Sequence, residues 1–405
     1  MTEQIQSELW PVAGVSGAPG AYDSKIAAGR EGGGAGRGKR IERRVCAAAQ
    51  RDGIEQGGTT MTQVSSKPGT TSTTNGNHAA AAQSQAQGKR ALPGPELWHS
   101  AAHSTDKPIV YVNGRMVPKR EAMVNVYDHG LLYGDGVFEG IRVYKGKIFK
   151  CMRHIERLWR CAEAIRMKVP ISKEEMVDIQ RACIEANNLT DGYIRLLVTR
   201  GVGTLGLDPR RCPTPGVICI ADQISLFPPD MYEKGMRVVV ANRPKTPIAC
   251  LDPRIKSLNY LNNILAKCEA IDYGCHEVVM LNTDGYVTEG SGDNIFVVKG
   301  GKLYTPPPED GMLEGITREF VIKQLCKDCG VKCLEKRMRL EDVLDGDEVF
   351  LTGSAAEIIS VTQIDQHDGK KITREVRISD GEGPITKKLR ARFREIVTSD
   401  HVPED

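Results

Sequence analysis

The periodic spacing of hydrophobic residues begins only after about residue 106. Residues 1–106 are rich in Gly, Ala, Ser, Thr, Gln and Asn and show no such period, so they bury too little apolar surface to offset the entropy of ordering. We therefore predict a disordered low-complexity extension over 1–106. Beyond it, short apolar runs that fit strands alternate with stretches whose apolar residues recur every three or four positions, as on one face of a helix. This alternation predicts an α/β (α+β) fold.

The run Phe227-Pro228-Pro229-Asp230 is the best candidate for a domain boundary, because two prolines interrupt regular structure and stiffen a linker. We predict a small α/β domain at 107–227, a linker at 228–234 and a large α/β domain at 235–400. The elements expected in the small domain are strands at 109–112, 137–143, 193–199 and 217–224 and helices at 153–167 and 172–186. Those expected in the large domain are strands at 237–241, 277–281, 286–288, 295–298, 302–304 and 348–352 and helices at 261–272 and 317–327. Because small ligands often bind in clefts between domains, we expect a site there.

Charge and cysteine content narrow the class of protein. The chain has 405 residues, a formal net charge of +3 and 12 cysteines without a compact, evenly spaced framework. The near balance of charge argues against nucleic acid as a partner. Scattered cysteines favour reduced thiols in an intracellular, cytoplasmic protein. No apolar stretch approaches the length of a membrane span, and no signal-peptide pattern stands at the start.

Three local features have other interpretations. The basic cluster at 37–44 could be a sorting or nucleic-acid signal, but a solvated run of charge is the simpler interpretation, and acidic residues in the segment argue against an organelle transit peptide. Met61 could serve as an alternative start codon. The spacing of Cys326, Cys329 and Cys333 hints at a metal site, but no histidine or second cysteine pair completes one, so we expect no metal.

Lys256 and Glu289 are the most informative candidates for chemistry. Lys256 precedes the helix expected at 261–272, and Glu289 stands in a turn with Gly290 and Gly292, which permit a close backbone approach to a ligand. A lysine followed at this distance by such a glutamate suggests a pyridoxal phosphate enzyme. The lysine would bind the cofactor as a Schiff base, and the glutamate would keep the pyridine nitrogen protonated. An isolated lysine or turn glutamate is usually a solvated surface charge instead.

A cofactor phosphate could be bound by two parts of the chain. Gly315-Ile316-Thr317 opens the helix expected at 317–327, where free N–H groups and the helix dipole favour an anion. An ordinary threonine N-cap is the alternative for the same residues. The second part would be an arginine of the helix at 153–167, and the pattern alone does not choose among the three that this helix offers: Arg153, Arg157 and Arg160.

A substrate carboxylate could be recognised at two places. The run 352–356 consists of small residues after an apolar strand, so its amides could point at an anion, although a plain tight turn has the same composition. Arg195 stands inside an apolar strand, where its charge requires a partner, and a substrate carboxylate is one candidate.

Together these motifs resemble the class IV aminotransferases, the fold-type IV pyridoxal phosphate enzymes, from about residue 108 to 398. The run from Glu289 to Arg318 follows the family signature without a gap. Within the family the chain is most similar to branched-chain amino acid aminotransferases. The sequences at 133–142 and 353–357 are close to those that this subgroup has at the same places. The resemblance implies two α/β domains with pyridoxal 5'-phosphate in the cleft between them. It also implies a homodimer or higher homo-oligomer in which pocket residues cross between subunits.

The resemblance assigns roles that spacing leaves open. At the cofactor it implies the catalytic Schiff-base lysine Lys256, the pyridine-nitrogen partner Glu289, the phenolate neighbour Tyr260, and the phosphate ligands Arg157, Ile316, Thr317 and Ser354. At the substrate it implies the pocket residues Phe138, Tyr133 and Gly292, the amide of Ala355 for the α-carboxylate, and Arg195 for the side-chain carboxylate of glutamate.

We therefore expect transamination of leucine, isoleucine or valine with 2-oxoglutarate, with no nucleic-acid or membrane partner. A D-amino acid aminotransferase is one alternative. That subgroup binds the substrate carboxylate with an Arg-x-His motif after the strand at 193–199, and residues 200–206 of this chain have neither the arginine nor the histidine in that position. An aminodeoxychorismate lyase is a second alternative, which would not obviously need Arg195. A cofactor-binding homologue without activity is the alternative outside enzymes.

Overall fold

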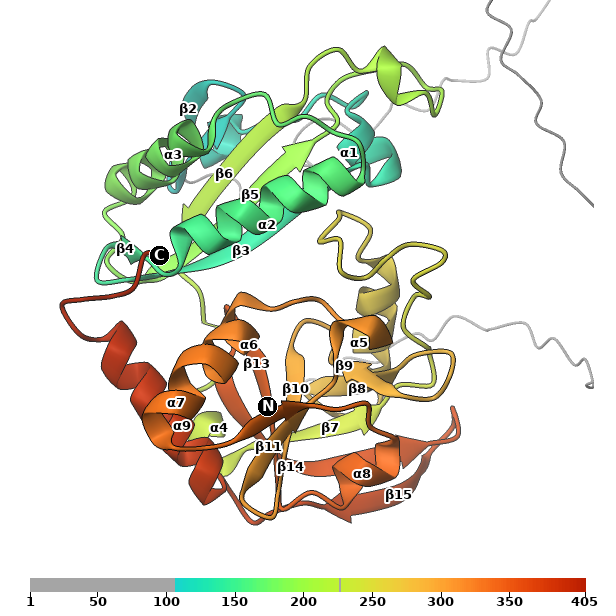
Figure 1. Ribbon diagram of the computed structural model, residues 1–405. Coiled ribbons are helices and arrows are strands. Elements are labelled where there is room, and N and C mark those ends of the chain that lie inside the picture. The colour runs from blue at the N-terminus through green and yellow to red at the C-terminus, as the bar shows by residue number, and fades with distance from the viewer. Residues whose placement is uncertain (1–105, 226) are drawn as a thin grey trace, which may run out of the picture. The chain divides into compact units, whose positions relative to one another are not determined.

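The computed structural model describes residues 106–225 and 227–405, which belong to one compact unit. The disordered extension predicted at 1–106 lies outside these residues except for its last position, and so do the basic cluster at 37–44 and Met61. Two sheets organise the described part of the chain (Figure 1). No helix within this part is both long and apolar enough to cross a membrane.

The first sheet is antiparallel and has six strands in the order β2-β1-β6-β5-β3-β4. Its strands are β1 (Ile109–Val112), β2 (Arg115–Pro118), β3 (Gly136–Tyr144), β4 (Lys147–Ile148), β5 (Gly192–Thr199) and β6 (Gly216–Asp222). A two-residue turn, Asn113-Gly114, joins β1 and β2, and both residues have the positive φ angles that such a hairpin requires. A short helix, α1 (His129–Tyr133), precedes β3.

Two amphipathic helices, α2 (Cys151–Ala164) and α3 (Lys173–Ala186), pack on this sheet (Figure 1). The apolar stripe of α2 is buried in a core that it shares with α3 and the inner faces of the strands. α3 begins at a capping box, in which Ser172 and Glu175 each accept a hydrogen bond from the backbone N–H of the other. The predicted helices at 153–167 and 172–186 are thus confirmed, with ends shifted by a few residues.

The second sheet has nine strands in the order β12-β11-β10-β13-β14-β7-β8-β9, with β15 paired to β14. Because β9 also pairs with β10, the strands from β10 to β9 close into a ring. Within the ring, β7 runs parallel to β8 and β14, and the remaining pairs are antiparallel. The strands are β7 (Met236–Val240), β8 (Glu277–Leu281), β9 (Val287–Glu289), β10 (Asn294–Lys299), β11 (Lys302–Thr305), β12 (Cys333–Glu335), β13 (Glu348–Gly353), β14 (Glu357–His367) and β15 (Ile372–Arg377).

Helices pack on both faces of the second sheet (Figure 1). They are α4 (Met231–Lys234), α5 (Leu261–Asp272), α6 (Ile316–Phe320), α7 (Cys326–Cys329), α8 (Leu340–Leu344) and α9 (Pro384–Val397). A π-helical turn at Val321–Leu325 joins α6 to α7, so that one continuous helix carries a local widening. Single 3-10 turns lie at Lys119–Glu121, Pro209–Arg211 and Pro308–Asp310.

The sequence predicted most of these elements but not all. The helix at 261–272 and the strand at 277–281 have the predicted bounds. The predicted linker at 228–234 was incomplete, because Met231–Lys234 forms a short helix whose Met231 and Tyr232 pack against the apolar core of the second sheet. Hairpins predicted at Asn113-Gly114 and at 144–149 correspond to β2 and β4, and the helix end passing into a strand predicted around Cys326–Cys333 corresponds to α7 and β12. The elements that the sequence did not predict are α1, α4, α8, α9, β14 and β15. We retain 107–227 and 235–400 as proposed domain bounds.

Candidate active site

A cavity of about 320 Å³ is lined by residues of both sheets and of the loops between their strands. Of the twelve residues that the sequence analysis assigned to the site, eleven line this cavity, and Tyr133 does not. The eleven are Phe138, Arg157, Arg195, Lys256, Tyr260, Glu289, Gly292, Ile316, Thr317, Ser354 and Ala355.

Lys256 is held in the cavity wall by the edge of the first sheet. Its carbonyl accepts a hydrogen bond from the N–H of Phe138 at 3.0 Å, and the adjoining Ser257 forms a bridge with Val137. The backbone N–H of Lys256 also donates to the thiol sulfur of Cys161 on α2 at 3.3 Å. These contacts hold the backbone of this loop residue against β3 and α2.

The ammonium of Lys256 contacts two aromatic side chains. Its Nζ donates to the hydroxyl of Tyr260 at 2.9 Å and lies 4.4 Å from the centre of the Phe138 ring. Burial first, and then the nearby charge of Arg157, lowers the pKa of Lys256 to about 8. A lysine with this pKa can be a neutral amine near physiological pH, as a nucleophile or a proton acceptor must be.

Tyr260 precedes α5 and remains a protonated phenol. Burial, followed by the negative charge of Glu289, raises the pKa of Tyr260 well above its usual range. The ring packs edge-on against Phe138, with 4.9 Å between ring centres. The hydroxyl can therefore donate a hydrogen bond to an anionic oxygen in the cavity while it accepts one from Lys256.

Glu289 ends β9 and is buried at the cavity wall. Its Oε1 pairs with the ammonium of Lys245 at 2.5 Å. Its Oε2 accepts hydrogen bonds from the N–H of Leu313 at 3.0 Å and from Nδ2 of Asn294 at 3.1 Å. The carboxylate is thus held in one orientation by donors from three separate loops and strands.

Arg157 is the arginine of α2 that reaches the cavity. It is buried and makes two hydrogen bonds of 2.7 Å to the carboxylate of Glu139, while its Nη1 donates to the carbonyl of Glu314 at 2.8 Å. His154 donates to the same carboxylate from Nδ1 at 2.8 Å. Burial opposes the ionisation of Glu139, but Arg157 and His154 outweigh it and hold the pKa of this carboxyl well below its usual range.

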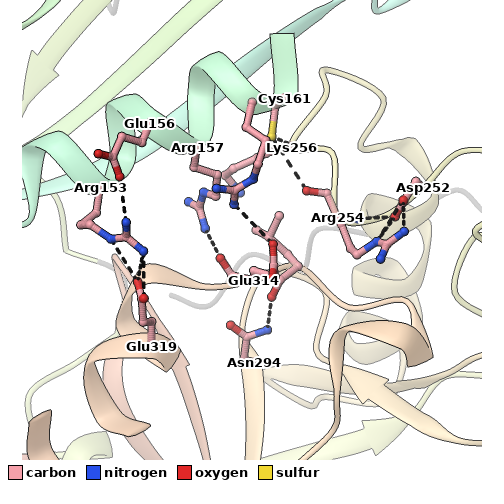
Figure 2. Close-up of polar contacts among 12 residues, drawn as sticks. Arg153, Glu156, Arg157, Cys161, Asp252, Arg254, Lys256, Asn294, Glu314 and Glu319 are labelled. Carbon is pink, nitrogen blue, oxygen red and sulfur yellow. Dashed lines mark hydrogen bonds and ion pairs between the residues drawn. The ribbon is translucent and has the colours of Figure 1, made fainter. Parts of the chain in front are cut away.

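The two other candidate arginines of this helix are turned elsewhere. Figure 2 shows Arg153 directed at Glu156 and Glu319, with the closest contacts at 2.8 Å. Arg160 makes a 3.3 Å contact to the side chain of Glu314 and is largely exposed. Neither residue lines the 320 Å³ cavity.

The first turn of the helix that starts with α6 also faces the cavity. Its N-cap is Gly315, which makes no side-chain cap, and Thr317 lies inside the helix, so the alternative of a threonine N-cap is wrong. A Cβ at Gly315 would collide with Oδ1 of Asn294, so only glycine fits this approach. Opposite, the turn after β13 brings Ser354 and Ala355 to the cavity. Among the described residues, Oγ1 of Thr352 is buried in this wall without a hydrogen-bond partner, as expected of a group that binds a ligand.

Arg195 lies on β5 with its guanidinium 4.7 Å from the centre of the Phe138 ring and 5.6 Å from that of Tyr193. No carboxylate of the described residues is paired with it. A cation stacked on aromatic faces at a cavity wall is available to an incoming anion.

Tyr133 is placed differently from the expectation. It belongs to α1, remains more than a third exposed, and donates its hydroxyl to the carbonyl of Leu205. Within one copy of the chain it does not line the cavity. In the single chain α1 is held by the cap of Asp128 and by the close approach of Gly130 to Thr199, which places Tyr133 away from this cavity. The role of Tyr133 in a pocket stays a prediction.

The cavity also contains charged residues that the sequence interpretation missed. Lys267 pairs with Glu277 at 3.1 Å, and Asp293 lies against Gly353, where a Cβ would collide with its Oδ1. Burial, and then the charge of Glu277, raises the pKa of Asp293 to about 7. Lys245 and Glu139 were missed as well. A lysine in a loop and a glutamate in a strand carry no sequence signal of burial, and their partners are brought to them only by the fold. No group of three or more His, Cys, Asp or Glu within residues 106–225 and 227–405 could hold a metal ion.

Comparison with known proteins places the chain among enzymes of one family. A family model described as "Amino-transferase class IV" matches residues 136–364. The putative branched-chain-amino-acid aminotransferase of Methanocaldococcus jannaschii is 47% identical over 289 residues, which cover 71% of this chain and 96% of that protein. The aminodeoxychorismate lyase of Bacillus subtilis is 35% identical over 260 residues, which cover 64% of this chain and 87% of the lyase. The branched-chain amino acid aminotransferase of Thermobaculum terrenum, solved in its PLP form, is 30% identical with a TM-score of 0.64 and covers 73% of this chain and 95% of that one.

Proposed function

Because the chain belongs to the class IV aminotransferases, we propose that it transfers the amino group of leucine, isoleucine or valine to 2-oxoglutarate, with pyridoxal 5'-phosphate as cofactor. The observation that carries this proposal is the convergence of Lys256, Glu289 and Arg157 on one cavity. An amine for the Schiff base, a carboxylate for the pyridine nitrogen and a cation for the phosphate together suit this cofactor.

The residues present fit the cofactor. Arg157, Thr317, Ser354 and the free N–H groups after Gly315 form a donor set suited to a phosphate dianion, and the unpartnered hydroxyl of Thr352 lies in the same wall. Glu289 would bind the pyridine nitrogen and Tyr260 the ring oxygen. When bound, pyridoxal phosphate supplies an electron sink for the substrate α-carbon.

Lys256 is proposed to bind the cofactor and to move the proton at the α-carbon. Its Nζ has a pKa of about 8 because burial and Arg157 disfavour the ammonium, and Tyr260 at 2.9 Å orients it. A base with a pKa near the working pH transfers protons efficiently in both directions, which a reversible amino transfer needs.

The proposed substrate pocket must accept apolar and acidic side chains in turn. The ring of Phe138 offers an apolar wall to a branched side chain, and the guanidinium of Arg195, stacked 4.7 Å from that ring, offers two donors to the distal carboxylate of glutamate. Gly292 leaves room near the reacting carbon, and the amide of Ala355 is proposed to bind the α-carboxylate.

We further propose a homodimer or higher homo-oligomer in the cytoplasm. Tyr133 and its neighbours Leu131, Val202 and Leu205 are exposed, as expected of a surface covered by a second copy that would bring Tyr133 to a pocket. The eleven cysteines of the described residues are all free thiols, which supports a reducing compartment. Light scattering of the purified protein tests the assembly.

The two alternatives on the same fold receive less support. Arg200 is paired with the carboxylate of Asp135 at 2.8 Å, so it is not free to bind a substrate carboxylate as a D-specific enzyme would require. The similarity to an aminodeoxychorismate lyase favours the lyase as the second candidate. The placement of Arg195 at the cavity wall, which a lyase would not obviously need, favours the transaminase.

The test is the absorption spectrum of the purified, cofactor-loaded protein, mixed separately with L-leucine and with D-alanine. Loss of the cofactor band with L-leucine alone, and its return on adding 2-oxoglutarate, is the expected result. Bleaching by D-alanine instead would refute the branched-chain assignment. No change with either amino acid would leave the lyase or an inactive homologue.

A further inference from the structure

Lys245 is a buried charge that the roles described above do not use. It lies in the loop after β7, where its backbone N–H donates to the carbonyl of Leu281 at 2.7 Å. Its side chain is almost wholly buried, and its Nζ lies 2.5 Å from Oε1 of Glu289. A buried ion pair gives little net stability compared with apolar residues of similar volume, so this pair calls for a functional explanation.

The hydrogen bonds of Glu289 leave room for one ligand. A carboxylate has about four acceptor positions. Lys245 occupies one on Oε1, while the N–H of Leu313 and Nδ2 of Asn294 occupy two on Oε2. The two neutral donors fix the orientation of the carboxylate, and Lys245 is the donor among these three that carries a charge.

We propose that Lys245 is a positioning residue that keeps Glu289 ionised, so that the shared proton stays on the pyridine nitrogen of the cofactor. This inference rests on the proposed function. The hydrogen bond between Glu289 and the ring nitrogen can have its proton on the nitrogen, which gives an ion pair, or on the carboxyl group, which leaves both partners neutral. Burial favours the neutral form. Lys245 touches the carboxylate directly, whereas the protonated ring nitrogen of a bound cofactor would lie beyond that carboxylate, which is opposite to it in charge. The lysine therefore attracts the carboxylate more than it repels the ring, and it stabilises the ionic form.

Among the described residues, Lys245 is the cation that contacts Glu289, whereas Arg157 is paired with Glu139 and Lys256 donates to Tyr260. Asp293 is acidic, and Tyr260 stays neutral. The negative charge of Glu289 raises the pKa of Tyr260, and the positive charge of Lys245 lowers it. A small cavity behind this wall is lined by Lys245, Tyr260 and Glu289 together.

The test uses full-length protein loaded with pyridoxal phosphate labelled with nitrogen-15 in the ring, whose chemical shift reports ring protonation. We expect a protonated ring in the wild type and a shift toward the unprotonated value in Lys245→Met. Lys245→Arg, which keeps the charge, should restore the protonated signal. The matched control is Arg237→Met, which breaks an ion pair between β7 and buried Asp365 away from the cavity and should leave the signal unchanged. Should Lys245→Met fail to fold, Lys245→Gln removes the charge but keeps a hydrogen-bond donor for Oε1.

Turnover provides a second readout. Lys245→Met should lower kcat by about 10- to 100-fold, by analogy with the loss of a partner that orients a metal ligand. An unchanged ring signal in both Lys245→Met and Lys245→Gln would overturn the inference, whatever happens to stability. If the wild type binds the cofactor with a protonated ring but does not react with branched-chain amino acids, the proposed function fails while the role of Lys245 stands. If the wild type binds no cofactor, both fail.

Discussion

Replacing Glu139 with glutamine should lower the stability of the protein, because it leaves the proposed phosphate-binding arginine, Arg157, buried without a counter-charge. Glu139 is fully buried and accepts two hydrogen bonds of 2.7 Å from Arg157 and one of 2.8 Å from His154. Glutamine has nearly the same shape but no charge, so Arg157 would remain buried without a counter-ion. Breaking a buried ion pair in this way costs about 3–5 kcal/mol.

The loss should be large in cofactor-free protein and smaller when an anion is present. At roughly 2–4 °C per kcal/mol for a domain of this size, Glu139→Gln should lower the Tm of the stripped protein by roughly 6–20 °C. Inorganic phosphate or pyridoxal phosphate should recover part of this loss, because a dianion bound by Arg157 replaces the missing charge.

Thermal unfolding of stripped protein, with phosphate or with chloride at equal ionic strength, measures both effects. The matched control is Asp135→Asn, which removes the bidentate partner of Arg200 outside the cavity. Its loss of stability should not respond to phosphate. If phosphate raises the Tm of wild type and Glu139→Gln equally, the idea that Glu139 supplies the counter-charge of a phosphate-binding Arg157 is wrong.

Three further predictions follow from the charged groups of the cavity. In cofactor-free protein, Lys256→Met should be more stable than wild type near neutral pH, and the gain should shrink as the pH rises from about 8 to about 10.4. Burial and Arg157 lower the pKa of Lys256 to about 8 in the folded protein, compared with about 10.4 in an unfolded chain. Between these pH values the unfolded chain binds more protons, so the stability of the folded wild type rises with pH. A difference in unfolding free energy between variant and wild type that stays constant with pH in urea unfolding would contradict this prediction. Asp293→Asn should show the opposite trend, because burial and Glu277 raise the pKa of Asp293 to about 7, above about 3.9 in an unfolded chain, so the carboxyl lowers wild-type stability as the pH rises from about 4 to 7. The gain of the asparagine variant in the same assay should be full above pH 7 and absent below about 4. Arg195→Met should raise the KM for 2-oxoglutarate by about 10- to 100-fold, from about 1.5–3 kcal/mol for hydrogen bonds to a charged group, and change the KM for leucine little; steady-state kinetics with both substrates checks it, and equal rises would count against a distal carboxylate at Arg195.

The sequence was sufficient wherever the information is local. The helix Leu261–Asp272 and the strand Glu277–Leu281 were predicted with their bounds, because apolar spacing and the residues between them fix the backbone over a few positions. The pair Lys256 and Glu289 was identified for a related reason, since both stand in short runs whose composition is unusual. The sequence did not predict β14, β15 and α9, which follow the turn of small residues at 353–356.

The fold decided every choice that depends on which side chain meets which. Arg153, Arg157 and Arg160 lie three or four positions apart on one helix, so periodicity gives all three nearly the same face. Only the packing of α2 buries Arg157 against Glu139 and leaves Arg153 to Glu319. The sequence likewise gave no reason to join Lys245 to Glu289, which are 44 positions apart and meet only because β7, β8 and β9 are neighbours in the closed ring.

The sequence by itself thus determined the kind of chemistry, because the amine, the carboxylate and the helix opening that binds phosphate are each encoded in a few adjacent residues. The tertiary structure alone decided which arginine faces the cavity, which charges compensate Glu289 and Glu139, and that Tyr133 lies outside the pocket of a single chain. The physical reason is that short-range sterics and hydrogen bonds set the local backbone conformation. The burial of a side chain and the charges around it depend instead on residues far apart in the chain.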